Sequence, residues 1–244
     1  MLLELSPLNQ PAGRFGSADA MAPKSRSYQI SATPVIVFGH LLFIAVTTLV
    51  LVWLLKFREG LAFESANKFK IFNLHPLLMV IGFILMAGEA IMAYKSTPSR
   101  RDIQVQKAVH LTLQTIALGC GIFGIVVIFK FHNETNMPDM VTLHSWLGMI
   151  TICLFGLQYL LGFFSYVFPG AESYSRAAYL PWHTFGGLLI FFLAICTAEM
   201  GLLQKFLSLF LIRSQEALIL LLPSLWFSPD ISHGSLLSNY WTIL

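Results

Sequence analysis

Charged residues are scarce in this 244-residue chain, where lysine, arginine, aspartate and glutamate together make up 11%, against roughly 25% in an average soluble domain. The formal net charge is only +3, and no basic cluster with interleaved aromatic residues occurs, which argues against a nucleic-acid-binding protein. Hydrophobic residues make up 56% of the chain and aromatic residues 14%. This composition predicts a protein that crosses a membrane several times rather than a globule with a large core.

Cysteine is also rare. The three cysteines, Cys120, Cys153 and Cys196, all lie within apolar runs and none belongs to a CxxC pair, so we interpret them as small buried side chains rather than disulfide partners. The sequence contains no HExxH motif, and no strand–glycine–helix pattern of the kind that indicates a dinucleotide-binding domain. It therefore disfavours a zinc site of the HExxH type and a ferric reductase that takes its electrons from NADPH.

The first 33 residues are polar and irregular, with prolines at positions 7, 11 and 23. They show no cleavable signal peptide, and their composition predicts a disordered segment over residues 1–33. The membrane-embedded part of the chain is therefore expected to begin near Pro34.

Five long apolar runs follow, each with the ~20 residues that a helix needs to cross a membrane: Pro34–Leu55, Ile71–Tyr94, Ala108–Phe131, Val141–Phe168 and Leu180–Leu203. Helix is the expected form because backbone groups in lipid must form hydrogen bonds within their own segment. The connections are short and polar, so consecutive helices should alternate in direction and pack as an antiparallel bundle.

We therefore predict an all-α membrane protein, an antiparallel transmembrane helical bundle with five spans and a doubtful sixth. The transmembrane domain is expected over residues 34–216. Residues 217–244 are expected to form an atypical tail, interpreted as a truncated sixth helix, because the apolar segment 217–227 is too short to span and contains Pro223. Lysine and arginine are almost evenly divided between the two sides of this arrangement, so the positive-inside rule leaves the orientation open.

Four histidines near the starts of the second to fifth runs, His75, His110, His144 and His183, are separated by 35, 34 and 39 residues. An ionisable side chain inside a membrane is unfavourable and by default indicates function. Because the helices alternate in direction, His75 and His144 should share one membrane depth, and His110 and His183 the opposite depth. The sequence thus predicts two histidine pairs, one near each face.

Two facing neutral imidazoles are a suitable pair of axial ligands for the iron of haem b, and the apolar macrocycle suits a cavity at lipid depth. Glycines are frequent in the same four helices, where they allow close helix packing and leave room for a flat cofactor. With both axial positions occupied by histidine, electron transfer is favoured over oxygen binding. We therefore expect the central four helices to hold two haems.

Other interpretations of the histidines remain open. A single histidine in a membrane helix is often a hydrogen-bonding contact between helices, and His40 in the first run, with no second histidine expected at its depth, fits this interpretation. Zinc would need further cysteine or carboxylate ligands nearby, whereas Glu89 and Glu199 each lie near the helix end opposite the histidine. The alternative function is a haem-free, histidine-based proton or metal transporter.

Five stretches, four of which contain one of these histidines, resemble the cytochrome b-561 family of ascorbate-dependent transmembrane oxidoreductases, especially its plant members: Phe72–Pro76, Gly88–Lys95, Val109–Gln114, Leu143–Gly148 and Pro181–His183. The resemblance implies two b haems, held by His75 with His144 on the non-cytoplasmic side and by His110 with His183 on the cytoplasmic side, and a cytoplasmic N-terminus. It further implies one-electron transfer from cytosolic ascorbate to monodehydroascorbate or a ferric chelate. The resemblance also implies a subunit of six helices and a homodimer. It implies a location in a vacuolar membrane, another endomembrane or the plasma membrane.

The resemblance also suggests substrate residues. Lys107, Tyr166 and Arg176 match cytoplasmic positions that would bind ascorbate and assist catalysis, with Lys95 adding positive potential. On the far face, Phe131 and His132 match positions that would hold the acceptor, with His132 handling a proton. The alternative is that all of these are ordinary interfacial or loop residues. The chain departs from many relatives at Val141, where they carry a tyrosine, and at Glu199.

Overall fold

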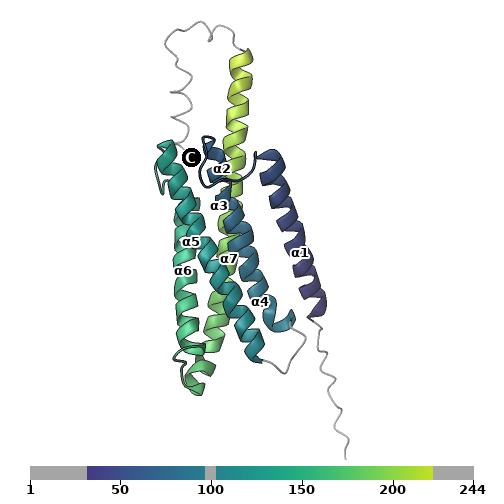
Figure 1. Cartoon of the computed structure of the whole chain (residues 1–244), viewed down its shortest axis with the longest axis vertical. Coiled ribbons are helices and arrows are strands. Elements are labelled where there is room, and N and C mark those ends of the chain that lie inside the picture. The colour runs from purple at the N-terminus through teal and green to yellow at the C-terminus, as the bar shows by residue number, and fades with distance from the viewer. Residues whose placement is uncertain (1–31, 97–102, 222–244) are drawn as a thin grey trace, which may run out of the picture. The chain divides into compact units, whose positions relative to one another are not determined.

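The computed structural model describes residues 32–96 and 103–221, and these residues form helices joined by short connections, with no strand among them. In chain order (Figure 1), the elements are α1 (Thr33–Val52), the π-helical segment η1 (Trp53–Phe57), α2 (Lys68–Phe72), α3 (Leu74–Leu77), the π-helical segment η2 (Leu78–Leu85), α4 (Met86–Ser96), α5 (Ile103–Thr135), α6 (Leu143–Tyr166) and α7 (Ser173–Leu221).

Five helices in the described part of the chain are long and apolar enough to cross a membrane: Thr33–Phe57, Lys68–Tyr94, Ile103–Thr135, Leu143–Tyr166 and Ser173–Leu211. In the tested window of each, at most 22% of the residues are buried inside the protein, so most apolar side chains face outward, as lipid contact requires. The predicted all-helical membrane fold and its five spans are therefore confirmed.

The helices extend beyond the apolar runs from which they were predicted. The clearest case is α7, which begins at Ser173 and continues to Leu221, whereas the apolar run covers only Leu180–Leu203. Polar residues such as Lys205 end the run, but no glycine or proline interrupts residues 204–221, so nothing breaks the helix. Most of the doubtful sixth segment lies outside the described residues, as do almost all of the N-terminal segment and the tail, so those domain limits remain predictions.

The second span is irregular where it enters the bundle. Asn73, which is fully buried, separates α2 from α3, and its side-chain amide donates hydrogen bonds to the carbonyl oxygens of Arg58 at 2.7 Å and Gly60 at 2.8 Å. Pro76 lacks a backbone donor, and the next turns form the π-helical segment η2, a form that often accompanies functional sites. This irregularity lies directly around His75.

The core lies between the four helices that carry the paired histidines. Seven buried residues form it: Phe83, Ala87, Ala117, Ile152, Phe155, Ile190 and Ala194. They come from η2, α4, α5, α6 and α7, while α1 packs at the edge against α4 (Figure 1). His40 on α1 accordingly contacts Glu89 on α4, with Nδ1 and Oε1 2.9 Å apart, as expected for a polar contact between helices.

Candidate cofactor and electron-transfer site

The four histidines meet in two pairs. The rings of His75 on α3 and His144 on α6 have their centroids 6.3 Å apart and are almost perpendicular, with an interplanar angle of 88°. The rings of His110 on α5 and His183 on α7 have centroids 6.4 Å apart at an angle of 66°. These are the partners indicated by alternating helix direction. The first pair lies where α3 and α6 begin and the second lies toward the start of α5 and α7, at the opposite end of the bundle.

The depth of each histidine within its helix differs from the prediction. Each was expected two to four residues inside the start of its helix. His144 lies one residue after α6 begins at Leu143. His75 lies one residue after α3 begins at Leu74, but seven residues after the second span begins at Lys68. Similarly, α5 begins at Ile103, seven residues before His110, and α7 begins at Ser173, ten residues before His183. Polar turns precede the apolar runs in both helices, so hydropathy alone placed the helix starts too late.

Hydrogen bonds determine which nitrogen of each ring is available. In three of the four histidines, Nδ1 lies within hydrogen-bond distance of a carbonyl oxygen on a neighbouring helix: His75 with Gly124 at 3.0 Å, His110 with Ala90 at 2.8 Å and His144 with Thr197 at 2.9 Å. A carbonyl oxygen can only accept, so Nδ1 carries the proton. The Nε2 lone pair is then free to ligate a metal, which is the usual arrangement of a metal-binding histidine.

His183 has a different partner. The amide nitrogen of Gln158 on α6 lies 3.1 Å from its Nδ1 and 2.6 Å from its backbone carbonyl oxygen. The amide packs beside Gly186 and Gly187, where a β-carbon would lie 3.6 Å from it, an ordinary van der Waals distance. Our sequence reasoning missed Gln158, although an amide in the middle of an apolar run was a signal that could have been noticed.

Two glycines allow the histidine rings to lie against the neighbouring helix. A β-carbon at Gly201 would lie 2.7 Å from Cε1 of His144, and one at Gly162 would lie 2.9 Å from Cε1 of His183. Real β-carbons essentially never approach another heavy atom so closely. The space beside each pair therefore depends on glycine at these positions.

The residues fit a haem better than a metal ion bound by protein alone. A bond from a metal to an imidazole nitrogen is about 2 Å long and the ring centre lies about 1 Å farther, so two axial imidazoles place their ring centres about 6 Å apart. Both observed separations agree with this value. Within the described residues, no group of three or more histidine, cysteine or acidic side chains could hold a metal ion. A haem supplies its own four in-plane ligands and needs only these two.

A cavity of about 250 Å³ adjoins His75 and His144 and is lined mainly by apolar side chains, which suits a flat apolar group. His132 and Lys205 also line it. Nδ1 of His132 lies 2.7 Å from a carboxylate oxygen of Asp139, and Phe131 is buried with its ring 5.3 Å from that of Phe72. The structure thus brings the predicted His132 to the first pair, whereas Phe131 is also part of the core. Asp139 and Lys205 were not predicted.

Tyrosines surround the second pair. The ring of Tyr166 lies 5.5 Å from that of His183, and its hydroxyl donates to the carbonyl oxygen of Arg176 at 3.2 Å. Tyr179 lies 5.7 Å from His183, and its buried hydroxyl has no hydrogen-bond partner among the described residues. Tyr94 lies 5.4 Å from His110. An unpaired buried hydroxyl is unfavourable unless a bound group satisfies it.

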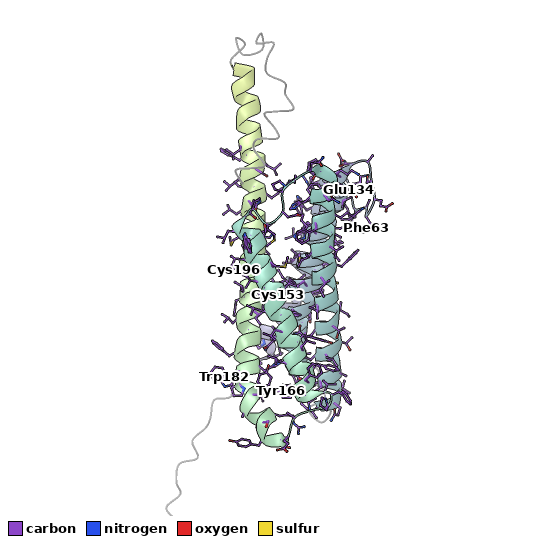
Figure 2. The ribbon with its side chains drawn as sticks, turned by 90° about the vertical axis from the view of Figure 1, so that its left-hand side faces the viewer. Phe63, Glu134, Cys153, Tyr166, Trp182 and Cys196 are labelled. Atoms are coloured by element: carbon purple, nitrogen blue, oxygen red, sulfur yellow. The ribbon has the colours of Figure 1, made fainter. Side chains whose placement is uncertain are left out.

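The predicted substrate residues at this end are only partly brought together. Figure 2 shows Tyr166 near the same end as Trp182, the neighbour of His183, and opposite to Glu134. The guanidinium of Arg176 donates to the hydroxyl oxygen of Ser173 at 3.2 Å. Lys107 lies on α5 one turn before His110 and is partly exposed. The side chain of Lys95 lies outside the described residues.

Comparison with known proteins shows which family this sequence resembles. The family model described as eukaryotic cytochrome b561 matches residues 74–209. The chain is 48% identical over 176 residues to the probable ascorbate-specific transmembrane electron transporter 1 of Oryza sativa subsp. japonica, which covers 72% of this chain and 75% of the relative. It is 45% identical over 177 residues to transmembrane ascorbate ferrireductase 1 of Arabidopsis thaliana, covering 72% and 73% of the two chains.

A more distant relative is the transmembrane ascorbate-dependent reductase CYB561 of Ovis aries, 35% identical over 191 residues, or 78% of this chain and 72% of that protein. The family match includes all four paired histidines and covers more than half of the chain. The predicted family is therefore confirmed: the chain belongs to the eukaryotic cytochrome b561 family.

Proposed function

We propose that this protein transfers electrons from cytosolic ascorbate across a membrane, through two haem b groups, to monodehydroascorbate or a ferric chelate. The observation that carries the proposal is the pair of imidazole couples, with ring centroids 6.3 and 6.4 Å apart, at opposite ends of one helical bundle. The relatives named as ascorbate-specific electron transporters and ascorbate ferrireductases support ascorbate as the donor.

In this proposal His75 with His144 would hold one haem, and His110 with His183 would hold the other. Each haem, when bound, would supply a one-electron carrier. The carbonyl oxygens of Gly124, Ala90 and Thr197 hold three of the rings in the required tautomer. The core between the two pairs excludes water, so protons remain at the two faces while electrons cross.

We place the ascorbate site beside His110 and His183, at the cytoplasmic face. Ascorbate is a monoanion at neutral pH, and Lys107 and Arg176 supply positive charge that attracts and positions it. Tyr166 packs against His183 and donates a hydrogen bond to the backbone carbonyl of Arg176, so it holds the Arg176 backbone near the histidine pair. Lys95 adds positive potential. One electron leaves ascorbate as it gives up one proton to water at this face, and monodehydroascorbate is released.

The acceptor site lies beside His75 and His144, at the opposite face. There the electron either reduces iron(III) to iron(II) in a chelate or reduces monodehydroascorbate, which takes up one proton to form ascorbate. His132 can supply that proton, because its Nδ1 lies 2.7 Å from a carboxylate oxygen of Asp139, which orients the ring at the cavity. Phe131 forms part of the apolar wall. We further propose that the protein forms a homodimer and lies in a vacuolar, other endomembrane or plasma membrane.

The purified protein is expected to show a Soret band and a reduced-minus-oxidised spectrum typical of b haems, with two haems per chain. Ascorbate alone should reduce it. Both expectations can be checked by anaerobic spectroscopy combined with haem and protein quantitation. A colourless protein that transports protons or metal ions would instead favour the haem-free transporter, and a single haem per chain would contradict the two-centre arrangement.

Replacing Lys107 or Arg176 by methionine is expected to raise KM for ascorbate about tenfold with little change in kcat, because a charge-assisted hydrogen bond to the substrate anion is lost. Steady-state reduction kinetics would measure this. Lys56→Met, which removes a lysine at the opposite end of the bundle, is the matched control. A neutral quinol donor should be unaffected, and an equal loss with that donor would show that the substitution disturbs the haem centre instead.

A further inference from the structure

Three aromatic rings lie together at the His110–His183 end. Tyr166 on α6 and Tyr179 on α7 stack with ring centroids 5.9 Å apart and an interplanar angle of 24°. Each ring also lies close to that of His183, at 5.5 Å for Tyr166 and 5.7 Å for Tyr179. Tyr179 precedes His183 by four residues on one helix, so the two side chains share a face. Both phenol rings are therefore held beside one member of the second histidine pair.

The hydroxyls of these two tyrosines differ in what they contact. The hydroxyl of Tyr166 donates to the backbone carbonyl oxygen of Arg176 at 3.2 Å. The hydroxyl oxygen of Tyr179 is buried and has no hydrogen-bond partner among the described residues. A buried polar group without a partner is rare in native structures. The Tyr179 hydroxyl therefore indicates a hydrogen bond to a group that is not part of the polypeptide.

Cationic side chains nearby indicate the charge of that group. Arg176 lies three residues before Tyr179 on α7, within one helical turn. Its guanidinium donates to the hydroxyl oxygen of Ser173 at 3.2 Å, and with five N–H donors it can bind a second group as well. Lys107 lies one turn before His110 on α5. Two cations this close favour an anionic acceptor, to which a hydroxyl forms a shorter and stronger hydrogen bond than to a neutral one.

We propose that the Tyr179 hydroxyl donates a hydrogen bond to an anionic oxygen at the His110–His183 end. This inference rests on the proposed function, which places ascorbate at this end of the bundle. The anionic oxygen has two possible sources, the enolate of ascorbate or a carboxylate group of the haem itself. In either case Tyr179 is a binding residue of the site where the electron enters the protein.

The experiment compares Tyr179→Phe with wild type, because phenylalanine keeps the ring and removes only the hydroxyl. Tyr174→Phe is the matched control, since Tyr174 lies five residues earlier on the same helix and is 84% exposed. Three measurements are made on the haem-containing, detergent-purified protein. They are a redox titration with haem quantitation, the steady-state kinetics of reduction by ascorbate or by a neutral quinol, and the melting temperature of the oxidised protein.

If ascorbate supplies the oxygen, Tyr179→Phe should raise KM for ascorbate about tenfold, since a hydrogen bond to a charged acceptor is lost. The value of kcat, both haem potentials and reduction by the quinol should stay unchanged. The melting temperature, measured without ascorbate, should stay equal or rise, because the substitution removes a buried hydroxyl that has no partner in that state.

If the haem supplies the oxygen, one of the two potentials should shift or one haem should be lost. The melting temperature of the oxidised protein should then fall, because a hydrogen bond present in that state is removed. Reduction by ascorbate and by the quinol should change to the same extent. Either this pattern or the preceding one supports the proposal and identifies the source of the oxygen.

Unchanged KM for ascorbate together with unchanged potentials would overturn the proposal, because the hydroxyl would then bind neither source. So would an equal effect of Tyr174→Phe, since the effect would not depend on the buried hydroxyl. Equal slowing with both donors at unchanged potentials and haem content would contradict it as well. Failure of the proposed function is seen separately, because wild-type protein would then lack two haems or would not be reduced by ascorbate.

Discussion

Replacement of His110 by alanine is expected to leave one haem per chain instead of two and to abolish rapid reduction by ascorbate. The imidazole of His110 faces that of His183 with ring centroids 6.4 Å apart, and its loss removes one of the two axial ligands at the end where we place ascorbate. The His75–His144 pair is built from other helices and should keep its haem. Rapid mixing with ascorbate and haem quantitation measure both effects.

His40→Ala is the matched control for this substitution. His40 is also a histidine in a membrane span, but its ring contacts the carboxylate of Glu89 on a neighbouring helix rather than another imidazole. We expect this variant to retain two haems and fast reduction by ascorbate. If His110→Ala lost both haems equally, or if His40→Ala lost one, the assignment of ligands to pairs would be wrong.

Gly201→Ala is expected to disrupt the His75–His144 centre although it changes no ligand. The added methyl group would lie 2.7 Å from Cε1 of His144 and 3.0 Å from its Nδ1. The ring must therefore move, which strains or breaks the hydrogen bond from Nδ1 to the carbonyl of Thr197. Overpacking of this kind typically destabilises by about 1–3 kcal/mol. We expect partial or complete loss of one haem, measured as the haem-to-protein ratio.

Gly119→Ala provides the control, because a β-carbon there would meet no atom within 4 Å. It should keep both haems and leave the melting temperature equal or higher, since alanine favours helix over glycine by about 1 kcal/mol. Gly162→Ala tests the same mechanism at the other end, where the β-carbon would lie 2.9 Å from Cε1 of His183. Retention of two haems in both Gly201→Ala and Gly162→Ala would show that the rings are not held where the structure places them.

The histidine pairs illustrate how far sequence reasoning reached. Alternating helix direction was enough to pair His75 with His144 and His110 with His183, because a helix start on one side of a membrane fixes the side of every later start. Hydropathy likewise indicated five spans. It misplaced helix ends, as in α7, because a helix can continue through polar residues after it has left the lipid.

Several features of the site depend on contacts that no local pattern contains. Gln158 meets His183 from 25 residues away, and Gly201 meets the ring of His144 from a separate helix. No sequence pattern singled out Lys205, which the fold places beside Phe69 and the first histidine pair. Whether these contacts form depends on which side of each helix faces the bundle. The sequence does not determine that side, because apolar residues occur all around each helix.

The sequence by itself therefore determined the class of protein, the number of membrane spans and the partner of each histidine. These properties follow from the length, polarity and order of the runs, through the requirement that lipid-embedded backbone be helical. Only the tertiary structure decided which glycines make room for the rings, which carbonyl oxygens set the tautomers, and which cations face the cavity. Such features depend on distances of a few ångströms between helices, and those distances are set by packing in the assembled bundle.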